Sequence, residues 1–532
     1  MNRLKIHSPP RDLSRIWILL FSFASMVFLY LRTFLLPATP FITLGDEAHY
    51  FIHALRMLHG QLPYRDFFTL IFPGTDLLYV GIFQLLGVHQ WLVQGLLLVL
   101  GLLLSWIVLW ISSSVLRGPS AILAALLFLV FDFNSALDAT HHWWSTLFVM
   151  AAVGLLLGGM SQIRILAVGA LCGVATLFAQ THGGLSFLAL ALYLGWTNRE
   201  DKQSSNLFCE LLLLCMPFAT IVILVVGYYV RLVGFRTMTY WTIYFPVVFF
   251  RDVEGNTPIT FFQVPPVHSA VYLFPLIPYF FIHAIVPLIY LLCVFRLIRD
   301  KNSMEQQQWR KILLLTFVGM ALFISIMSAP TFLRLSAVSM PDVVLCIWFL
   351  DRSTDLYRRM RIILWAAAII SLVYFPATRQ LHRHDIVNLP TGRAAFITDK
   401  QCERIWWLAQ HTHPGETFFN DPTAAFALSL ESPGPLNFVT PSEFTRPQQV
   451  DALLLSMTAH RTRYVFLYPA LTAPALAKDN LGSFREYIAT NYHLAKTLSS
   501  GQIWQRNGTV SNDAKGASSD YAPDRVQRAD ME

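Results

Sequence analysis

Two adjacent acidic residues, Asp46 and Glu47, directly follow the first membrane-length apolar run of the chain. Acidic side chains at a membrane boundary are costly to place and are seldom idle. The segment after them has helical periodicity, with apolar residues on one face (Phe51, Leu55, Leu58) and polar residues on the other (Asp46, His49, His53, Arg56). A carboxylate there could act as a general base. The alternative is that Asp46 only caps this helix after Gly45 and that the polar stripe is a solvated face.

More polar residues occur in later loops that we expect on the same side of the membrane. They are Asp132, Asn134, Asp138, His141 and His142, then Gln180 to Gly183 with His182, then Arg236, Arg251 and Asp252, and finally Thr331 and Arg334. An acid among them could orient an acceptor hydroxyl, and an arginine or histidine could stabilise a leaving phosphate, where negative charge grows.

Each of these residues also has a structural alternative. Asp138 could cap a helix that begins near His141. His141 and His142 precede two tryptophans, and this group is typical of an interfacial belt. Arg334 begins an apolar run, so its side chain could bind a lipid phosphate or extend to the interface.

The composition is that of a membrane protein that crosses the bilayer many times. Of 532 residues, 55% are hydrophobic and only 13% are charged, where a soluble domain has about 25% charged residues. The net charge of +7 could suggest nucleic acid as a partner. The basic residues instead lie between apolar runs on alternate sides, as the positive-inside rule requires, so we expect no nucleic-acid partner.

Eleven apolar runs have the length or composition of membrane spans. They cover about 16–37, 92–116, 119–133, 143–159, 164–179, 184–197, 207–232, 269–297, 312–329, 334–351 and 361–376. The basic residues 1–15 place the N-terminus in the cytoplasm, with the first run as an uncleaved anchor. We expect the loop with Asp46 on the outside, and interfacial helices at about 46–59 and 66–86.

The composition changes after residue 376. Strand-like pieces (394–397, 417–419, 464–467) alternate with helix-like pieces (401–411, 446–460, 481–492), and 493–506 could form a hairpin. This alternation predicts a small external α/β domain over 377–506, attached to a transmembrane module over 1–376. Residues 507–532 are polar and without an apolar period, which predicts disorder.

Six cysteines indicate neither a disulfide framework nor a metal site, because no pair has ligand spacing. His49 and His53 are four residues apart, a spacing compatible with zinc, but such histidines on an interfacial helix are usually amphipathic filler.

An acid pair at the outer surface with basic and aromatic loops nearby would suit transfer of a head group from a lipid-linked donor. The sequence here resembles the GT-C glycosyltransferases, particularly the protein mannosyltransferase and aminoarabinose transferase group. The resemblance lies in the acid pair, the following segment Ala48–Gly60, Leu85–Trp91 before the next span, and Leu137-Asp138. The group often has Lys-Pro-Pro at the second interfacial helix. Here Phe72-Pro73-Gly74 stands there without the lysine, and Arg65 is a possible substitute.

We expect a bacterial inner membrane, because the sequence has a single good N-glycosylation sequon (Asn507-Gly508-Thr509) and no retention signal. The resemblance implies a polyprenyl-phosphate sugar donor and a lipid, glycan or protein acceptor. It implies Asp46 as the base or acceptor-orienting acid, Glu47 as its partner and Asp138 as the second acid. We expect substrate-binding roles for Arg334, His141, His142, Arg65, His49 and His182. No cofactor is required, although Mg²⁺ or Mn²⁺ at the three acids is an option. One acid acting directly on the acceptor predicts inversion at the sugar carbon. The rival hypotheses are a secondary transporter or lipid flippase, and a non-catalytic membrane protein with an external binding domain.

Overall fold

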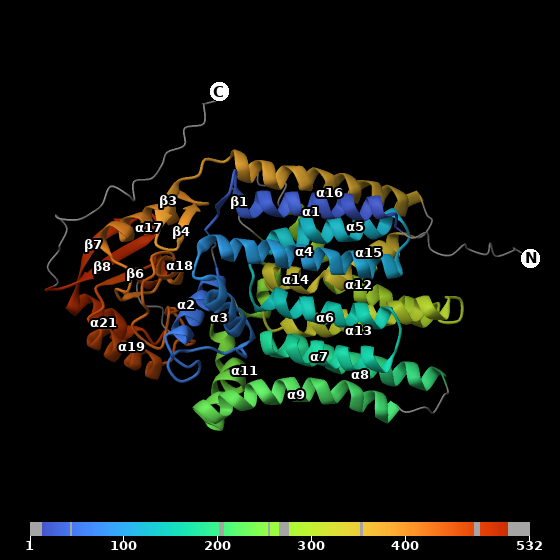
Figure 1. Ribbon diagram of the computed structural model, residues 1–532, viewed down its shortest axis with the longest axis horizontal. Helices are drawn as coiled ribbons and strands as arrows, with labels where there is room; N and C mark the ends of the chain where they lie inside the picture. The colour runs from blue at the N-terminus through green and yellow to red at the C-terminus, as the bar shows by residue number, and fades with distance from the viewer. Residues whose placement is uncertain are drawn as a thin grey trace, which may run out of the picture.

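The computed structural model describes residues 13–42, 45–201, 207–253, 256–264, 276–351, 355–472 and 479–508. The basic leader before residue 13 and nearly all of the predicted disordered tail lie outside these residues. The chain forms a bundle of roughly parallel long helices, and a region with short strands covers one end of it (Figure 1). The two termini of the described chain therefore belong to different parts of the molecule.

The eleven predicted apolar runs all coincide with helices of the bundle. These are α1 (Arg15–Thr33), α4 (Gln90–Val115), α5 (Pro119–Leu127), α6 (His141–Leu157), α7 (Gln162–Phe178), α8 (Gln180–Asp201), α9 (Leu207–Val233), α12 (Leu276–Arg299), α13 (Gln306–Ile326), the pair α14 (Phe332–Val338) and α15 (Met340–Leu350), and α16 (Asp355–Leu381).

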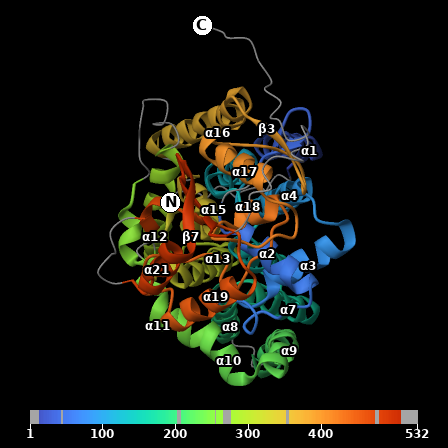
Figure 2. The ribbon, with the colours of Figure 1, turned by 90° about the vertical axis from the view of Figure 1, so that its left-hand side faces the viewer.

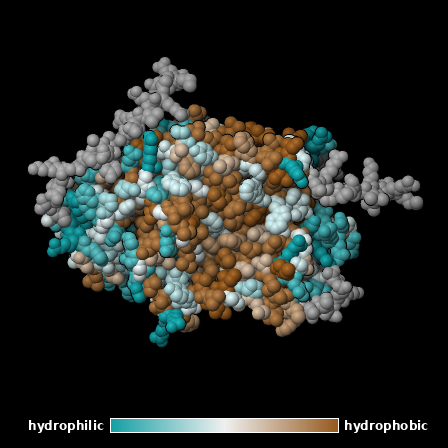
Figure 3. Space-filling model, viewed as in Figure 1, coloured by the Kyte–Doolittle hydropathy of each residue, from teal (hydrophilic) through white to brown (hydrophobic). Residues whose placement is uncertain are grey.

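The length and apolar composition of these helices are those of an integral membrane protein. Among the described residues, seven helical segments are long and apolar enough to cross a bilayer, or eight if α14 and α15 form one span. α6 and α7 are apolar but shorter. On the face that Figure 3 shows, a broad hydrophobic band covers the bundle and hydrophilic residues gather at its two ends. The polytopic fold is thus confirmed, and the eleven crossings stay a prediction.

Two of the helical runs are interrupted inside the bundle. α5 passes into a π-helical turn (Phe128–Asp132) and then a 3-10 turn (Phe133–Ala136). α14 and α15 meet at a bend of 66°. Pro341 lies in the first turn of α15, and because proline has no backbone N–H it starts a helix more readily than it continues one.

The first predicted interfacial helix is observed as α2 (Glu47–Leu58). The second is shorter than expected: α3 covers Gly74–Leu86, and residues 66–73 are not helical. Pro73 immediately precedes α3, and the residue before a proline is disfavoured in helical geometry, which explains the late start. The alternative that the polar stripe of α2 is a solvated face is wrong. Its apolar Phe51 and its polar His53 and Arg56 are all buried, because the C-terminal region covers the side that the bundle leaves open.

The C-terminal region contains a hairpin and a four-stranded sheet. β3 (Ile386–Leu389) pairs with β4 (Gly392–Ala395), and the sheet has the order β5-β6-β8-β7. Its strands are β5 (Phe418–Phe419), β6 (Tyr464–Leu467), β7 (Tyr492–Leu498) and β8 (Gly501–Arg506), and only β5 and β6 are parallel. The helices are α17 (Asp399–His411), α18 (Pro422–Ala427), α19 (Pro447–Ala459), α20 (Pro469–Thr472) and α21 (Gly482–Asn491). The strands β5 and β6, the helices α17, α19 and α21 and the final hairpin of β7 and β8 occur close to where the alternation predicted them. β4 begins two residues earlier than predicted, and β3, α18 and α20 were not predicted.

The C-terminal region packs directly on α2 and α3, the two short helices at the end of the bundle. Figure 2 shows it in front of the bundle end, with α18 close to α2. The Phe51 ring of α2 lies 4.8 Å from the Phe426 ring of α18, and one hydrophobic cluster joins α2, α3 and the inner face of the sheet. Backbone hydrogen bonds from Phe68 to Pro435 and from Ile42 to Ala395 add to this contact. The cluster holds α2 between the bundle and the sheet.

Candidate active site

A cavity of about 810 Å³ lies where α2, the bundle end and the C-terminal region meet. From the first third of the chain it is lined by Asp46, His49, Tyr50, His53, Phe68, Thr69, Leu70, Ile71, His141 and His142, and by Ala179 to His182. The middle contributes Thr242, Ile243, Pro246, Val247, Phe250, Arg251, Val253, Asn256, Ser325, Ile326, Ser328 and Arg334, and the C-terminal region contributes Leu436 to Phe438, Thr440, Phe444, Thr445 and Gln449. Six of the nine predicted site residues are therefore in its walls.

Asp46 precedes the first turn of α2 and faces this cavity. Its side chain makes no capping hydrogen bond with α2, so helix capping does not account for it. The carboxyl is accessible from the cavity, yet the surrounding protein excludes much of the bulk water. This desolvation raises the pKa of Asp46, and the nearby Arg334 guanidinium acts in the opposite direction. An accessible carboxylate in such surroundings can accept a proton at neutral pH.

Glu47 lies outside the cavity wall and is fully buried. Its carboxylate accepts a hydrogen bond from the backbone N–H of Ala139. Ala139 belongs to the segment between the 3-10 turn and α6, so Glu47 ties α2 to the loop that carries Asp138. The geometry gives Glu47 a positioning role.

Asp138 is also buried and outside the cavity wall. Its Oδ1 accepts a hydrogen bond of 3.0 Å from the Thr140 hydroxyl, and Thr140 itself is the N-cap of α6. Burial raises the pKa of Asp138, and the negative charge of Asp46 raises it further. The charge on Asp46 thus favours the protonated form of Asp138.

The three acids do not form a metal site. No group of three His, Cys, Asp or Glu side chains in the described parts of the chain is placed to hold an ion. Glu47 is bonded to a backbone amide and Asp138 to Thr140, so the donor atoms do not converge. No step below uses a metal.

Three histidines form a buried row in the first turns of α6 and α8. Nδ1 of His141 lies 2.6 Å from the Tyr50 hydroxyl, and Nδ1 of His182 lies 2.8 Å from the Ser145 hydroxyl. His142 lies between them, with ring centroids 3.9 Å from His141 and 5.4 Å from His182. These histidines line the cavity, and the interfacial-belt interpretation is wrong for this group because the tryptophans that follow, at positions 143 and 144, are buried in the core.

The predicted loop around His182 is helical instead. Gln180 to Gly183 form the first turn of α8. The apolar periodicity that predicts this helix does not extend over its first turn, because the polar side chains of this turn face the cavity. Gly183 packs against the backbone of Thr176 in α7, and this close approach fixes where His182 enters the cavity.

His49 and His53 lie on the cavity side of α2 and do not share a metal. The His49 ring contacts the Phe438 ring at 4.5 Å, and Nδ1 of His53 lies 3.2 Å from Oδ1 of the buried Asp76. Burial lowers the pKa of His49 to about 3, so this imidazole is neutral at physiological pH.

Arg334 in the first turn of α14 supplies a cation next to Asp46. Its guanidinium donates to the Ala329 carbonyl and to Oδ1 of Asn256, both at 3.1 Å, and lies over the Phe250 ring. Arg65 does not reach the cavity: it is exposed and pairs with Asp66 at 2.7 Å. In the described chain, the basic cavity residue apart from the histidines and Arg334 is Arg251.

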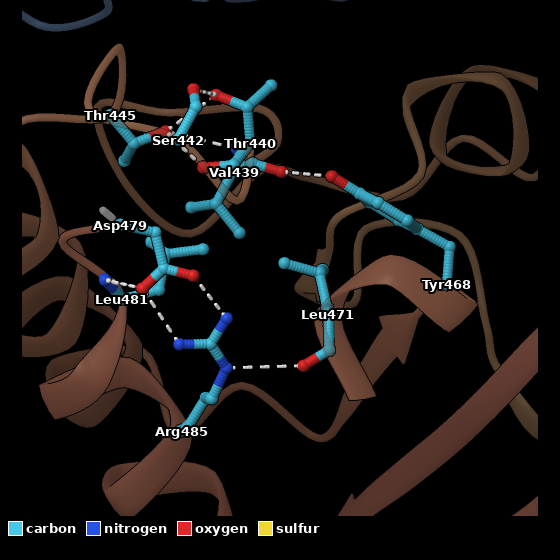
Figure 4. Close-up of polar contacts among 9 residues, drawn as sticks. All are labelled: Val439, Thr440, Ser442, Thr445, Tyr468, Leu471, Asp479, Leu481 and Arg485. Atoms are coloured by element: carbon cyan, nitrogen blue, oxygen red, sulfur yellow. Dashed lines mark hydrogen bonds and ion pairs between the residues drawn. The ribbon is translucent and has the colours of Figure 1, made fainter. Parts of the chain in front are cut away.

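The segment from Leu436 to Thr445 closes the cavity from the C-terminal side. Its backbone N–H at Thr440 donates to the Thr445 hydroxyl at 3.0 Å, and the Tyr468 hydroxyl donates to the Val439 carbonyl at 2.6 Å (Figure 4). Phe444 packs edge-on against Phe68, which precedes α3, and against Phe245, which follows α9 in the chain. Contacts on both sides thus fix this segment, and it forms one wall of the cavity.

Sequence reasoning missed this wall and also Tyr50 and Asn256. Nothing in the local pattern around residues 436–449 marks a site, since the segment has turn residues and scattered hydroxyls. Tyr50 was visible as part of the α2 segment, and its position one turn after Asp46 was the available signal.

Comparison with solved structures identifies the fold. No protein-family model matches the chain, and no curated sequence matches it. ArnT from Cupriavidus metallidurans bound to undecaprenyl phosphate superposes with a TM-score of 0.57 at 13% identity, covering 93% of this chain and 99% of that one. The apo state of the same enzyme gives 0.55 at 14% identity, with 92% and 97% covered. The apo oligosaccharyltransferase of Archaeoglobus fulgidus gives 0.50 at 12% identity, with 86% and 70% covered. These are GT-C glycosyltransferases, so the chain has the GT-C fold that the resemblance predicted.

Proposed function

From the GT-C fold and the cavity beside Asp46, we propose that this integral membrane protein is a glycosyltransferase. It takes a sugar from a polyprenyl-phosphate donor and transfers it to an acceptor hydroxyl on the extracytoplasmic side. The observation that carries this proposal is Asp46, which faces the cavity without a capping role and has Arg334 as its cationic neighbour. The ArnT structure that superposes on the chain contains undecaprenyl phosphate, which supports a donor of that class.

In the proposed reaction the acceptor oxygen attacks the anomeric carbon of the donor. The carboxylate of Asp46 takes the proton of the acceptor hydroxyl as the new C–O bond forms. The bond from the anomeric carbon to the phosphate oxygen breaks, and its electron pair leaves with the polyprenyl phosphate. Arg334 stabilises the charge that develops on this phosphate. A single displacement inverts the configuration at the sugar carbon.

The positioning roles follow from the contacts of the site. Glu47 holds the loop of Asp138 against α2, and the negative charge of Asp46 raises the pKa of Asp138. Tyr50 and His141 are hydrogen bonded, and with His142 and His182 they form a polar wall for the donor head group. His49 stays neutral beside Asp46 and adds no competing positive charge.

The proposed orientation places the cavity outside a bacterial inner membrane, with the N-terminus in the cytoplasm. The positions of the basic residues support this orientation. Five of them lie around the connection from α12 to α13, at the bundle end away from the cavity: Arg296, Arg299, Lys301, Arg310 and Lys311.

Transfer from a panel of radiolabelled polyprenyl-phosphate sugars into membrane extracts tests the proposal. Label should move to an acceptor with the wild type and not with Asp46→Asn, and the donor that works names the sugar. Asp46→Asn turning over at the wild-type rate would disprove the base assignment. No transfer from any donor with folded wild-type protein would disprove the transferase.

One observation favours a second candidate function, transport or flipping of a lipid-linked substrate. Both helix interruptions in the bundle carry a fully buried acid, Asp132 in the π-helical turn and Asp342 in the first turn of α15. Broken helices with buried acids are typical of transporter binding sites. Counterflow of a labelled polyprenyl-phosphate sugar in proteoliposomes that is lost in Asp132→Asn and retained in Asp46→Asn would favour this second function.

A further inference from the structure

The His53–Asp76 pair presents one ring nitrogen to the cavity. His53 lies seven residues after Asp46 on α2, which is about 10 Å along a helix axis. Its Nδ1 is 3.2 Å from Oδ1 of Asp76, and both side chains are buried. The other ring nitrogen of His53, Nε2, has no hydrogen-bond partner in the part of the chain that the structure describes, so it can form a hydrogen bond with a bound hydroxyl.

The wall opposite α2 offers uncharged hydrogen-bonding groups. Asn437, Thr440, Thr445 and Gln449 line it, and in the described chain no C-terminal residue that lines the cavity is charged. Gln449 is 8% exposed. Its Oε1 accepts from the backbone N–H of Arg446 at 2.9 Å, while Nε2 has no partner among the described residues. A buried donor without a partner costs free energy, so a substrate hydroxyl that accepts from it would bind favourably.

An aromatic side chain completes this part of the cavity. Phe438 lines the wall and contacts His49 of α2 at a ring-centroid distance of 4.5 Å. Apolar ring faces between hydroxyl and amide groups provide both contacts that a sugar ring uses, because it has apolar faces and polar edges.

We propose that the acceptor is a neutral carbohydrate, bound between α2 and the segment Asn437–Gln449. The inference rests on the proposed transferase function and names the acceptor class that it left open. The acceptor hydroxyl lies at Asp46, and the rest of the sugar extends along α2 to His53, whose Nε2 forms a hydrogen bond with a second hydroxyl. A phosphorylated acceptor would need cations beside it, and none of the cavity-lining residues of the segment Asn437–Gln449 is cationic.

A comparison of acceptors tests the proposal on the purified full-length protein in lipid nanodiscs. With the donor identified by the transfer assay, the probes are neutral oligosaccharides, a Ser/Thr-containing peptide and a phosphorylated glucosamine disaccharide lipid. We expect kcat/KM to be highest for a neutral oligosaccharide. Transfer mainly to the peptide or to the phosphorylated lipid would overturn the proposal. Absence of donor turnover in the wild type would instead refute the transferase function on which it rests.

Two substitutions locate the acceptor in the cavity. Gln449→Glu keeps the oxygen that accepts from Arg446 and replaces the free donor, and Asp76→Asn replaces the carboxylate that holds the His53 ring. We expect each to raise the acceptor KM about 2- to 12-fold, the loss of one hydrogen bond, with the donor KM unchanged. The matched controls are Gln448→Glu, exposed beside Gln449, and His59→Gln, exposed at the end of α2. Acceptor KM values equal to those of the controls would overturn the placement. If a variant does not fold, the wild-type acceptor panel still decides.

Discussion

Replacing Asp46 by asparagine separates catalysis from stability at one position. The side chain keeps its size and one oxygen but can no longer take a proton. General acid–base catalysis contributes roughly 10²- to 10⁴-fold, which corresponds to about 3–5 kcal/mol of activation free energy. We therefore expect kcat to fall by at least about 100-fold, while the donor KM changes little because Arg334 remains in place.

The stability of the same variant should not fall. The protein around Asp46 raises the pKa of its carboxyl, so the folded state holds the proton more tightly than the unfolded chain does. Stability from this group is therefore fully present below the pKa of the unfolded chain and declines as pH rises towards the folded pKa. The amide of the Asp46→Asn variant does not titrate and would not show this decline. The Tm of Asp46→Asn minus the Tm of the wild type should therefore increase from pH 4 to pH 8.

The assay combines initial rates of sugar transfer with thermal unfolding in the same detergent. The exposed Asp451 of α19 gives a matched control, and Asp451→Asn should leave kcat and Tm unchanged. Wild-type kcat should rise with pH as Asp46 loses its proton, with a midpoint above that of an ordinary aspartate. Near wild-type turnover of Asp46→Asn, or a Tm well below the wild type at pH 8, would refute the reasoning.

Three further substitutions test the surroundings of this carboxylate. Glu47→Ala leaves the buried N–H of Ala139 without its acceptor and should lower the free energy of unfolding by about 1–3 kcal/mol. Glu47→Gln keeps an acceptor and should lower this free energy less. Chemical denaturation of the two variants measures the difference. Arg334→Ala should reduce kcat/KM for the donor by about 10- to 150-fold, the loss of a hydrogen bond to a charged group, and an unchanged value would remove Arg334 from phosphate binding. In Gly183→Ala the new methyl meets the backbone of α7 and should cost about 1–3 kcal/mol by overpacking, while Gly184→Ala, with open space around it, is the control in the same thermal unfolding assay.

The helices and most strands could be predicted because they depend on local patterns. Each apolar run of the bundle is long and nearly free of charge, and such a run has few alternatives to a helix in a bilayer. The alternation of short apolar strands and amphipathic helices after residue 381 is equally local. Where a pattern was interrupted by polar residues, as at Gln180, or by a proline, as at Pro73, the element began at a different residue than predicted.

Site residues could be predicted only where a reactive residue type stands at a position that the local sequence marks as unusual. Asp46 follows a membrane-length run, and an acid there is unusual enough to be noticed. The wall at Asn437 and Gln449 was not predictable, since its residues are ordinary turn and helix residues until the C-terminal region folds back over α2. Arg65 illustrates the opposite error. It stands in the expected stretch of sequence, but its side chain points to solvent and pairs with its neighbour Asp66.

The distance in sequence between the two walls of the cavity has a consequence for the biosynthesis of the protein. Asp46 emerges from the ribosome early and enters the membrane with the first helices, whereas Gln449 is translated far later. Domains fold largely as they are synthesised, from the N-terminus onwards. With the roles proposed for Asp46 and Arg334, a nascent chain would carry both residues before it has the wall that closes the cavity. During this interval water would reach a bound donor, so translation of the C-terminal region would mark the point at which the proposed transferase protects its donor from hydrolysis.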